Sequence, residues 1–94
     1  MPLPWRFAPQ ADDDLTRVFT FLEGKSSRSA LRARARIING LVLISEHPRV
    51  GRSVGGAIRQ VVVRFGRTAY VIRYRLTADE ILITRIWHSK ERRP

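Results

Sequence analysis

The chain has 94 residues, of which 44% are hydrophobic, and it contains no cysteine. Domains usually span about 100–200 residues, so this length predicts a single domain, residues 1–94, and excludes a multidomain enzyme. The absence of cysteine excludes disulfides, thiolate metal sites and cysteine nucleophiles. The formal net charge of +10 predicts an anionic partner, which is a nucleic acid, an acidic protein or a membrane surface.

No segment has the pattern of a membrane span or of a secretion signal. The longest aliphatic run, residues 41–44, is far shorter than the roughly 20 apolar residues that a spanning helix needs. Residues 1–6 lack a basic region followed by an apolar stretch, so they do not read as a signal peptide. We therefore expect no membrane partner and a cytoplasmic location.

The first part of the chain predicts a short strand followed by a helix. Residues 3–8 alternate roughly between apolar and polar and are flanked by prolines, which is typical of an edge strand. The acidic residues 12–14 suit the first turn of a helix, and Gly24 suits its end. The apolar residues between them recur at helical spacing: Leu15, Val18, Phe19 and Leu22.

A second, longer helix is predicted from the capping residues Ser26 and Ser27 to Pro48. Its main apolar stripe consists of Leu31, Ile38, Leu41, Val42 and Ser45, with Ala30, Ala33, Ile37 and Ile44 beside it. Three arginines at four-residue spacing are expected on an outward face: Arg28, Arg32 and Arg36. Two amphipathic helices joined by a short turn predict a helical hairpin.

The rest of the chain predicts a sheet. A loop is expected at residues 49–56 because of its three glycines, and the hydrophobic period then changes from 3.6 to 2. Residues 57–65, 68–76 and 80–88 read as three strands joined by short turns, which is an antiparallel meander. The order β-α-α-β-β-β predicts an α+β fold, in which the helical hairpin packs on an antiparallel sheet of three to four strands.

Positive charge gathers in the second half of the chain. Residues 48–94 hold eleven basic and three acidic residues, a net charge of +8. The sheet face away from the helices can carry four arginines of neighbouring strands, although the sequence does not fix the register that would place all four on one side: Arg59, Arg73, Arg75 and Arg85. Residues 89–94 are expected to form a basic, flexible tail.

Two residues at the end of the last predicted strand each allow two interpretations. The unperturbed pKa of a histidine side chain is about 6.5, which suits a general acid or base. His88 therefore either has this role or hydrogen-bonds the backbone at the strand end. Trp87 either stacks on a nucleic-acid base or packs in the core. The sequence has neither a phosphate-binding glycine loop nor a metal-ligand cluster, so no cofactor and no metal are expected.

In several segments the chain resembles the RelE/ParE superfamily of type II toxin–antitoxin toxins. The matching segments are Pro9 to Leu22, His47-Pro48-x-x-Gly51, Ile58 to Val62, Tyr70 to Leu76, and Ile81 to His88 with Arg92. The resemblance implies a small basic toxin encoded beside an antitoxin, whose acidic, partly disordered segment wraps it in a hetero-oligomer. The candidate antitoxin contacts are then Arg28, Arg32 and Arg36.

The superfamily has two functional branches, and the resemblance favours one of them. RelE-like members cleave mRNA in the ribosomal A site, whereas ParE-like members act on DNA gyrase. The RelE branch typically has a basic residue after the tyrosine of the middle strand, where this chain has Val71. Several RelE-like members also carry a tyrosine near the C-terminus, but no tyrosine follows Tyr74 here. A ParE-like gyrase inhibitor is therefore expected, with ribosome-dependent mRNA cleavage as the alternative.

Each branch implies its own site residues. For a gyrase inhibitor, the expected target-binding residues are Arg59, Arg73, Arg75, Arg85, His88, Lys90, Arg92 and Arg93. For an mRNA endoribonuclease, the catalytic candidates are Arg64, Arg85, His88 and Lys90. A third interpretation, outside the toxin class, is a plain nucleic-acid-binding module with steeply salt-dependent binding.

Overall fold

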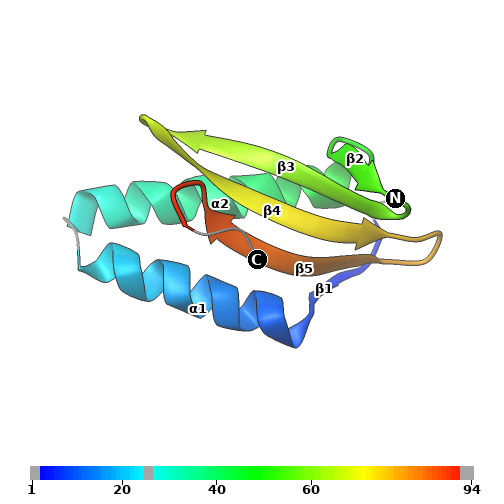
Figure 1. The fold of residues 1–94 in the computed structure, drawn as a ribbon, viewed down its shortest axis with the longest axis horizontal. Coiled ribbons are helices and arrows are strands. Elements are labelled where there is room, and N and C mark those ends of the chain that lie inside the picture. The colour runs from blue at the N-terminus through cyan, green and yellow to red at the C-terminus, as the bar shows by residue number, and fades with distance from the viewer. Residues whose placement is uncertain (1–2, 25–26, 92–94) are drawn as a thin grey trace.

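In the computed structural model, which describes residues 3–24 and 27–91, the chain forms two helices and five strands (Figure 1). The helices are α1 (Pro9–Glu23) and α2 (Ser27–Glu46). The strands are β1 (Trp5–Phe7), β2 (Arg52–Gly55), β3 (Ile58–Phe65), β4 (Thr68–Leu76) and β5 (Ile81–His88). The predicted α+β class, with a helical hairpin between the first strand and the meander, is confirmed. Within the described residues, no helix has the length and apolar character needed to cross a membrane.

All five strands belong to one sheet, in the order β1-β5-β4-β3-β2. Neighbours among β2 to β5 pair antiparallel, whereas β1 lies parallel to β5. The prediction of three to four strands is wrong, because the segment 49–56, which was expected to be a loop, contains β2. Arg52 of this strand pairs with Gln60 of β3. The glycines that suggested a loop form the hairpin turn instead: Gly55 and Gly56 have φ angles of 134° and 54°, which favour glycine.

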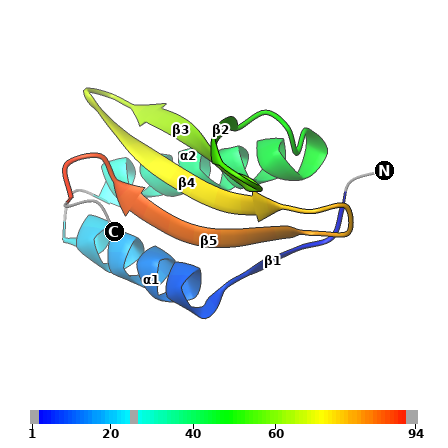
Figure 2. The same ribbon diagram turned by 45° about the vertical axis from the view of Figure 1, so that its right-hand side comes forward.

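Both helices pack on one face of the sheet, and neither covers the opposite face (Figures 1 and 2). The alternation predicted for β4 is confirmed, since Tyr70, Ile72 and Tyr74 join the core beneath the helices. Isoleucines from α2, β4 and β5 fill the same layer: Ile37, Ile44, Ile72, Ile81, Ile83 and Ile86. Burying each of these side chains contributes about 1.5–3 kcal/mol.

The side of α2 that faces the sheet differs from the predicted stripe. Apart from Leu41, the buried residues are those expected beside the stripe: Ala33, Ile37 and Ile44. Leu31, Ile38 and Val42 are instead 65%, 47% and 47% exposed. Gly40 accounts for this rotation, because a Cβ atom there would lie 2.7 Å from Val63 Cγ2. The helix therefore approaches the sheet on its glycine side and leaves the predicted stripe as an exposed apolar face.

The helix ends are close to the predicted ones. α1 begins at Pro9, before the acidic residues, because proline fits the first helical position, where no amide donor is needed. It ends at Glu23, followed by Gly24 as predicted. The predicted caps of α2 fall outside the described part of the chain, which omits Ser26 and the side chain of Ser27.

Side chains of α1 cover the edge of β5 where β1 ends. β1 pairs only with residues 81–83 of β5. Further along, Asp14 Oδ2 accepts a hydrogen bond from the Ile86 amide at 2.9 Å, and Arg17 Nη2 donates to the Ile86 carbonyl at 3.3 Å. The helix thus satisfies both backbone groups of an edge residue that would otherwise be left without a partner.

Asp14 is the buried acid of this edge and is only 2% exposed. Its carboxylate pairs with Arg85 at 2.8 Å and with Arg17 at 2.7 Å. Burial by itself raises the pKa of the Asp14 carboxyl, but the hydrogen bonds from Arg85, Arg17 and the Ile86 amide together hold that pKa below its ordinary value. We refer to Asp14, Arg17, Arg85 and Ile86 as the Asp14 cluster.

Candidate functional site

The face of the sheet that the helices leave open is rich in arginine. It holds a shallow depression of about 630 Å³, lined by arginines of three strands. These are Arg52 of β2, Arg73 and Arg75 of β4, and Arg85 of β5, with Gln60 of β3 between them. We call three of them, Arg52, Arg73 and Arg75, which form no ion pair with a described residue, the arginine face.

Arg73 lies at the centre of this face and is held from two sides. Its guanidinium carbon is 4.8 Å from the centroid of the Trp87 ring, which is a cation–π contact. Its Nη2 donates to Gln60 Oε1 at 3.3 Å, whereas its buried Nε has no hydrogen-bond partner. Trp87 is 4% exposed, so its ring supports Arg73 and is not open to a nucleic-acid base.

Arg52 and Arg75 extend the positive charge to the surface. Both are exposed, and neither forms an ion pair with a described residue. Unpaired guanidinium groups that line one depression repel one another, and they attract carboxylates or phosphates, which they bind in bidentate geometry. This part of the arginine face is therefore a ready binding surface for an anion.

Arg85 has a different role from its neighbours. It lines the same depression, but its Nε and Nη2 atoms donate to the two oxygens of Asp14 at 2.8 and 3.1 Å. The guanidinium is thus neutralised and fixed within the Asp14 cluster. The sequence predicted Arg85 on the open face but did not reveal its partner, Asp14.

Arg59 is not on the arginine face, which corrects the prediction. It pairs with Tyr74, a residue of the helix side, and its Nη1 donates to the carbonyls of Gly51 and Arg49 at 2.7 and 3.3 Å. One residue of register places a side chain on the other side of a sheet, so the sequence alone did not fix the face. Through these two hydrogen bonds, Arg59 stabilises the loop after α2.

Three of the four catalytic candidates, Arg64, Arg85 and His88, do not converge, and of Lys90 only the backbone amide forms a hydrogen bond with a described residue. His88 pairs with Tyr70 on the helix side, where the two rings meet edge to face at 5.1 Å. Its Nδ1 accepts a hydrogen bond from the Lys90 amide at 3.1 Å, so it bonds the backbone at the strand end, the second of its two interpretations. Arg64 points to the open face beyond the depression, beside Ala69, and Arg85 is bound to Asp14.

The remaining predicted contacts have separate places. Arg92 and Arg93 lie outside the described residues. Of the predicted tail, Ser89 exchanges hydrogen bonds with the backbone of Ala69, and Glu91 pairs with Arg17 at 2.8 Å.

On α2, the three predicted antitoxin contacts differ in what they touch. Arg28 is exposed. Arg32 lies over the Phe65 ring at 5.9 Å, and Arg36 Nη1 donates to the Arg64 carbonyl at 3.1 Å. The latter two therefore lean toward the end of β3.

Two features of this region were not predicted from the sequence. Arg52 was assigned to a loop, so it was not counted on the sheet. Asp14 was assigned with Asp12 and Asp13 to the acidic first turn of the helix, although its spacing from Val18 and Leu22 places it on the buried stripe of α1. Its helical phase was the available signal. Among the described residues, no group of three His, Asp or Glu side chains could hold a metal ion.

Known proteins share this fold. The chain superposes on a chain of the chromosomal ParDE TA system from P. aeruginosa with a TM-score of 0.73, covering 94% of this chain and 97% of that one at 20% identity. A match at that identity shows the fold alone. The family model described as the ParE toxin of the type II toxin-antitoxin system, parDE, matches residues 5–93. The chain belongs to this family and is the toxin of a type II toxin–antitoxin system.

Two curated relatives agree with that assignment. Toxin RelE1 of Caulobacter vibrioides is 39% identical over 84 residues, which cover 89% of this chain and 90% of the relative. Toxin RelE3 of the same organism is 35% identical over 85 residues, covering 90% and 92%. The toxin class is consistent in all comparisons, whereas the branch names differ: both curated relatives are named RelE, and the family model and the solved structure carry the ParE and ParDE names.

Proposed function

We propose that this toxin inhibits DNA gyrase and does not cleave RNA. The observation that carries the proposal is that, among the described residues, no group able to exchange a proton near neutral pH lines the depression of the arginine face. Besides the arginines, its lining consists of Gln10, Val54, Gly55, Ile58, Gln60 and Thr84. Because arginine keeps its proton throughout the physiological range, this surface binds anions without taking up or delivering a proton.

RNA cleavage through the 2′-hydroxyl needs such proton transfers. A base must take the hydroxyl proton, and an acid must protonate the leaving oxygen. His88 lies on the helix side of the sheet, with Nδ1 bonded to the Lys90 amide. Glu91 lines the far end of the open face, but Arg17 binds it at 2.8 Å. The proton-transfer groups of this region are therefore separated by the sheet or already paired.

Inhibition by binding alone requires no proton transfer at this surface. Arg52, Arg73 and Arg75 can bind carboxylates of gyrase or phosphates of the DNA that gyrase holds, because each of these anions offers two oxygens to a guanidinium group in bidentate geometry. We place target binding on these three arginines. Gyrase works on chromosomal DNA in the cytoplasm, so this function also places the toxin there.

For the antitoxin, we propose contact along the outer side of α2. Leu31, Ile38 and Val42 form an exposed apolar row there, and Arg28 and Arg32 lie beside it on the helix. An antitoxin segment with apolar residues on one side and carboxylates on the other fits such a surface, and it can fold as it binds.

The test of the target is a paired assay on one protein preparation. Supercoiling by purified gyrase is followed at rising toxin concentration, and mRNA integrity is followed with translating ribosomes. Loss of supercoiling with intact mRNA is the expected result, and Arg75→Glu should abolish it. Cut mRNA with normal supercoiling would overturn the proposal and redirect attention to His88 and Arg85.

A further inference from the structure

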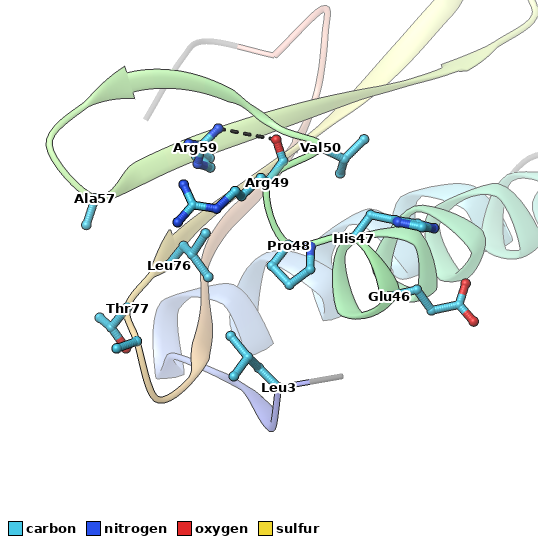
Figure 3. Close-up of a pocket in the computed structure, with 11 residues that line it drawn as sticks. Leu3, Glu46, His47, Pro48, Arg49, Val50, Ala57, Arg59, Leu76 and Thr77 are labelled. Carbon is cyan, nitrogen blue, oxygen red and sulfur yellow. Dashed lines mark hydrogen bonds between the residues drawn. The ribbon is translucent and has the colours of Figure 1, made fainter. Parts of the chain in front are cut away.

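A groove of about 710 Å³ lies at the end of the molecule where α2 meets the sheet, apart from the arginine face (Figure 3). Its walls come from the loop after α2, the start of β3, the end of β4 with its following turn, and Leu3 before β1. Ligand sites in proteins usually have volumes of about 300–1,000 Å³, so this groove is large enough for two or three side chains of a partner.

The loop that forms one wall is fixed by the buried residue Tyr74. Its hydroxyl donates to the Pro48 carbonyl at 2.6 Å and accepts from the Gly51 amide at 2.9 Å. Gly51 is required, because a Cβ atom there would lie 2.6 Å from the Tyr74 hydroxyl oxygen. The His47-Pro48-x-x-Gly51 motif thus builds a preformed wall, and a partner that binds here does not have to order it.

Two arginines give this groove a positive charge. Arg59 uses Nη1 for the Gly51 and Arg49 carbonyls, and its other nitrogens form no hydrogen bond with a described residue. The Arg49 side chain lines the same side of the groove, as Figure 3 shows. Neither has a carboxylate partner among the described residues, and the nearby Glu46 carboxylate points away from both.

Apolar side chains line the groove as well. They are Leu3, Pro48, Val50 and Leu76, of which Leu76 lies beside Arg49 in Figure 3 and Val50 is 45% exposed. A surface that combines an apolar wall with two unpaired guanidinium groups recognises an apolar side chain followed closely by a carboxylate. Nucleic acid matches only the charged half of this surface, and a second copy of a +10 chain would be repelled.

We propose that this groove is an anchoring site for an acidic segment of the antitoxin, in which one apolar side chain packs against Val50 and Leu76 and an adjacent carboxylate binds Arg49 and Arg59. The groove lies at the C-terminal end of α2, so a segment that runs along the exposed side of that helix reaches it directly. The proposal rests on the toxin–antitoxin class of the chain but not on which target the toxin attacks.

The experiment uses the full chain and its antitoxin, taken from the reading frame beside its gene. Arg49→Glu reverses the charge at the groove, and Val50→Asp makes its apolar wall acidic. Arg67→Glu, at the turn between β3 and β4 at the other end of β3, is the matched control for charge. Each variant is checked for folding by thermal unfolding, since Arg49 and Val50 are exposed and their substitution should leave the midpoint nearly unchanged.

Two readouts separate this proposal from the proposed target. The first is titration calorimetry, in which each groove variant should raise the antitoxin Kd about ten-fold or more while the control stays near wild type. The second is growth: the groove variants should remain toxic when expressed alone and should escape neutralisation. Because the chain has no cysteine, a fluorophore on Val50→Cys also reports directly whether the antitoxin covers the groove, with Arg67→Cys as its control.

The outcomes against the proposal are distinct. Wild-type affinity in both groove variants, or a label at position 50 that antitoxin leaves unchanged, would overturn it. An equal loss of affinity in all three charge variants would reduce the effect to net charge and would overturn it as well. A wild-type chain that is not toxic when expressed alone would count against the proposed function, while the binding readouts would still decide the anchoring site.

Discussion

The Asp14 cluster and the arginine face contain the same kind of side chain in opposite electrostatic situations. In the Asp14 cluster, Arg17 and Arg85 converge on one buried carboxylate and complete the edge of β5. On the arginine face, Arg52 and Arg75 have no carboxylate partner among residues 3–24 and 27–91, and Arg73 rests on Trp87 with its Nε unbonded. Arginines of the first kind stabilise the fold, and arginines of the second kind are left for an external anion.

This difference shows why net charge alone predicts function poorly. The chain carries 18 basic residues, and several of them serve the fold: Arg17 and Arg85 bind Asp14, and Arg59 binds loop carbonyls. A partner meets only the arginines that remain unpaired. Removing an arginine should therefore affect either stability or function, according to the region in which it lies.

The largest effect is expected for Asp14→Ala. The change removes the buried carboxylate that accepts from Arg85 and the Ile86 amide, and Arg17 keeps only its bonds to Glu91 and the Ile86 carbonyl. The expected loss is about 3–5 kcal/mol in the free energy of unfolding. A small domain has about 5–15 kcal/mol in total, so the thermal midpoint should fall by ~15 °C or more. Circular dichroism melting checks this.

The exposed neighbour Asp13 is the matched control for this change. Asp13→Ala should stay within about 0.5 kcal/mol of wild type, since it removes the same charge from the same helix without a buried partner. Equal destabilisation by the two variants would show that the cluster adds nothing beyond the charge of the helix N-terminus.

A smaller effect is expected when acid protonates Asp14 instead of mutation removing it. A carboxyl whose pKa is lowered by folding stabilises the protein above its unfolded pKa of about 3.9, and this contribution is lost as the pH falls through the folded pKa. The urea midpoint should thus be flat from pH 7 to about 5 and should fall below about pH 4.

Asp14→Asn separates this contribution from the other acids. Glu80, whose pKa is likewise lowered by hydrogen bonding to Arg6, titrates over the same range, but that pair is exposed and contributes little. The Asn variant should be less stable at pH 7 and should show a shallower acid transition. An unchanged acid slope in the variant would remove Asp14 from the pH dependence.

The order of elements was predictable from the sequence, whereas the pairing between distant residues was not. Alternation in Thr68–Leu76 and the spacing of Val18 and Leu22 report a local period, and both elements formed as predicted. β2 was missed because its glycines, read locally, indicate a loop, and only pairing with β3 shows that they form a turn.

The candidate site was predictable only in part for the same reason. Arg73 and Arg75 follow from alternation in one strand, but the face of Arg59 depends on the register between two strands. The contact between Asp14 and Arg85 joins residues far apart in sequence, so no local pattern reveals it. Residues whose role depends on long-range contacts were therefore the ones that the sequence misplaced.

On the arginine face, Arg75→Ala should change function without changing stability. Losing one unpaired guanidinium should raise the toxin concentration for half inhibition of gyrase about ten-fold, which corresponds to ~1.4 kcal/mol, and should lower the salt dependence of target binding. The unfolding free energy should stay within about 0.5 kcal/mol of wild type, because Arg75 is exposed and has no ion-pair partner among the described residues.

Arg6→Ala is the matched control for the arginine face. Arg6 lies on β1 and is already bound to Glu80 at 2.9 Å, so its removal changes the net charge equally but should leave inhibition nearly unchanged. If Arg6→Ala weakens the toxin as much as Arg75→Ala does, target binding depends on total charge, and the distinction between paired and unpaired arginines fails.

The smallest effect is expected for His88→Ala. His88 lies on the helix side against Tyr70 and accepts one backbone hydrogen bond, so its loss should cost about 1 kcal/mol of stability and leave gyrase inhibition as it is. The informative measurement is the ribosome assay on the same protein. If the wild-type chain cuts mRNA and His88→Ala does not, His88 takes part in proton transfer, and the helix side of the sheet becomes the catalytic one. If mRNA stays intact with both the wild-type chain and His88→Ala, the result supports inhibition through anion binding by the unpaired arginines, without RNA cleavage.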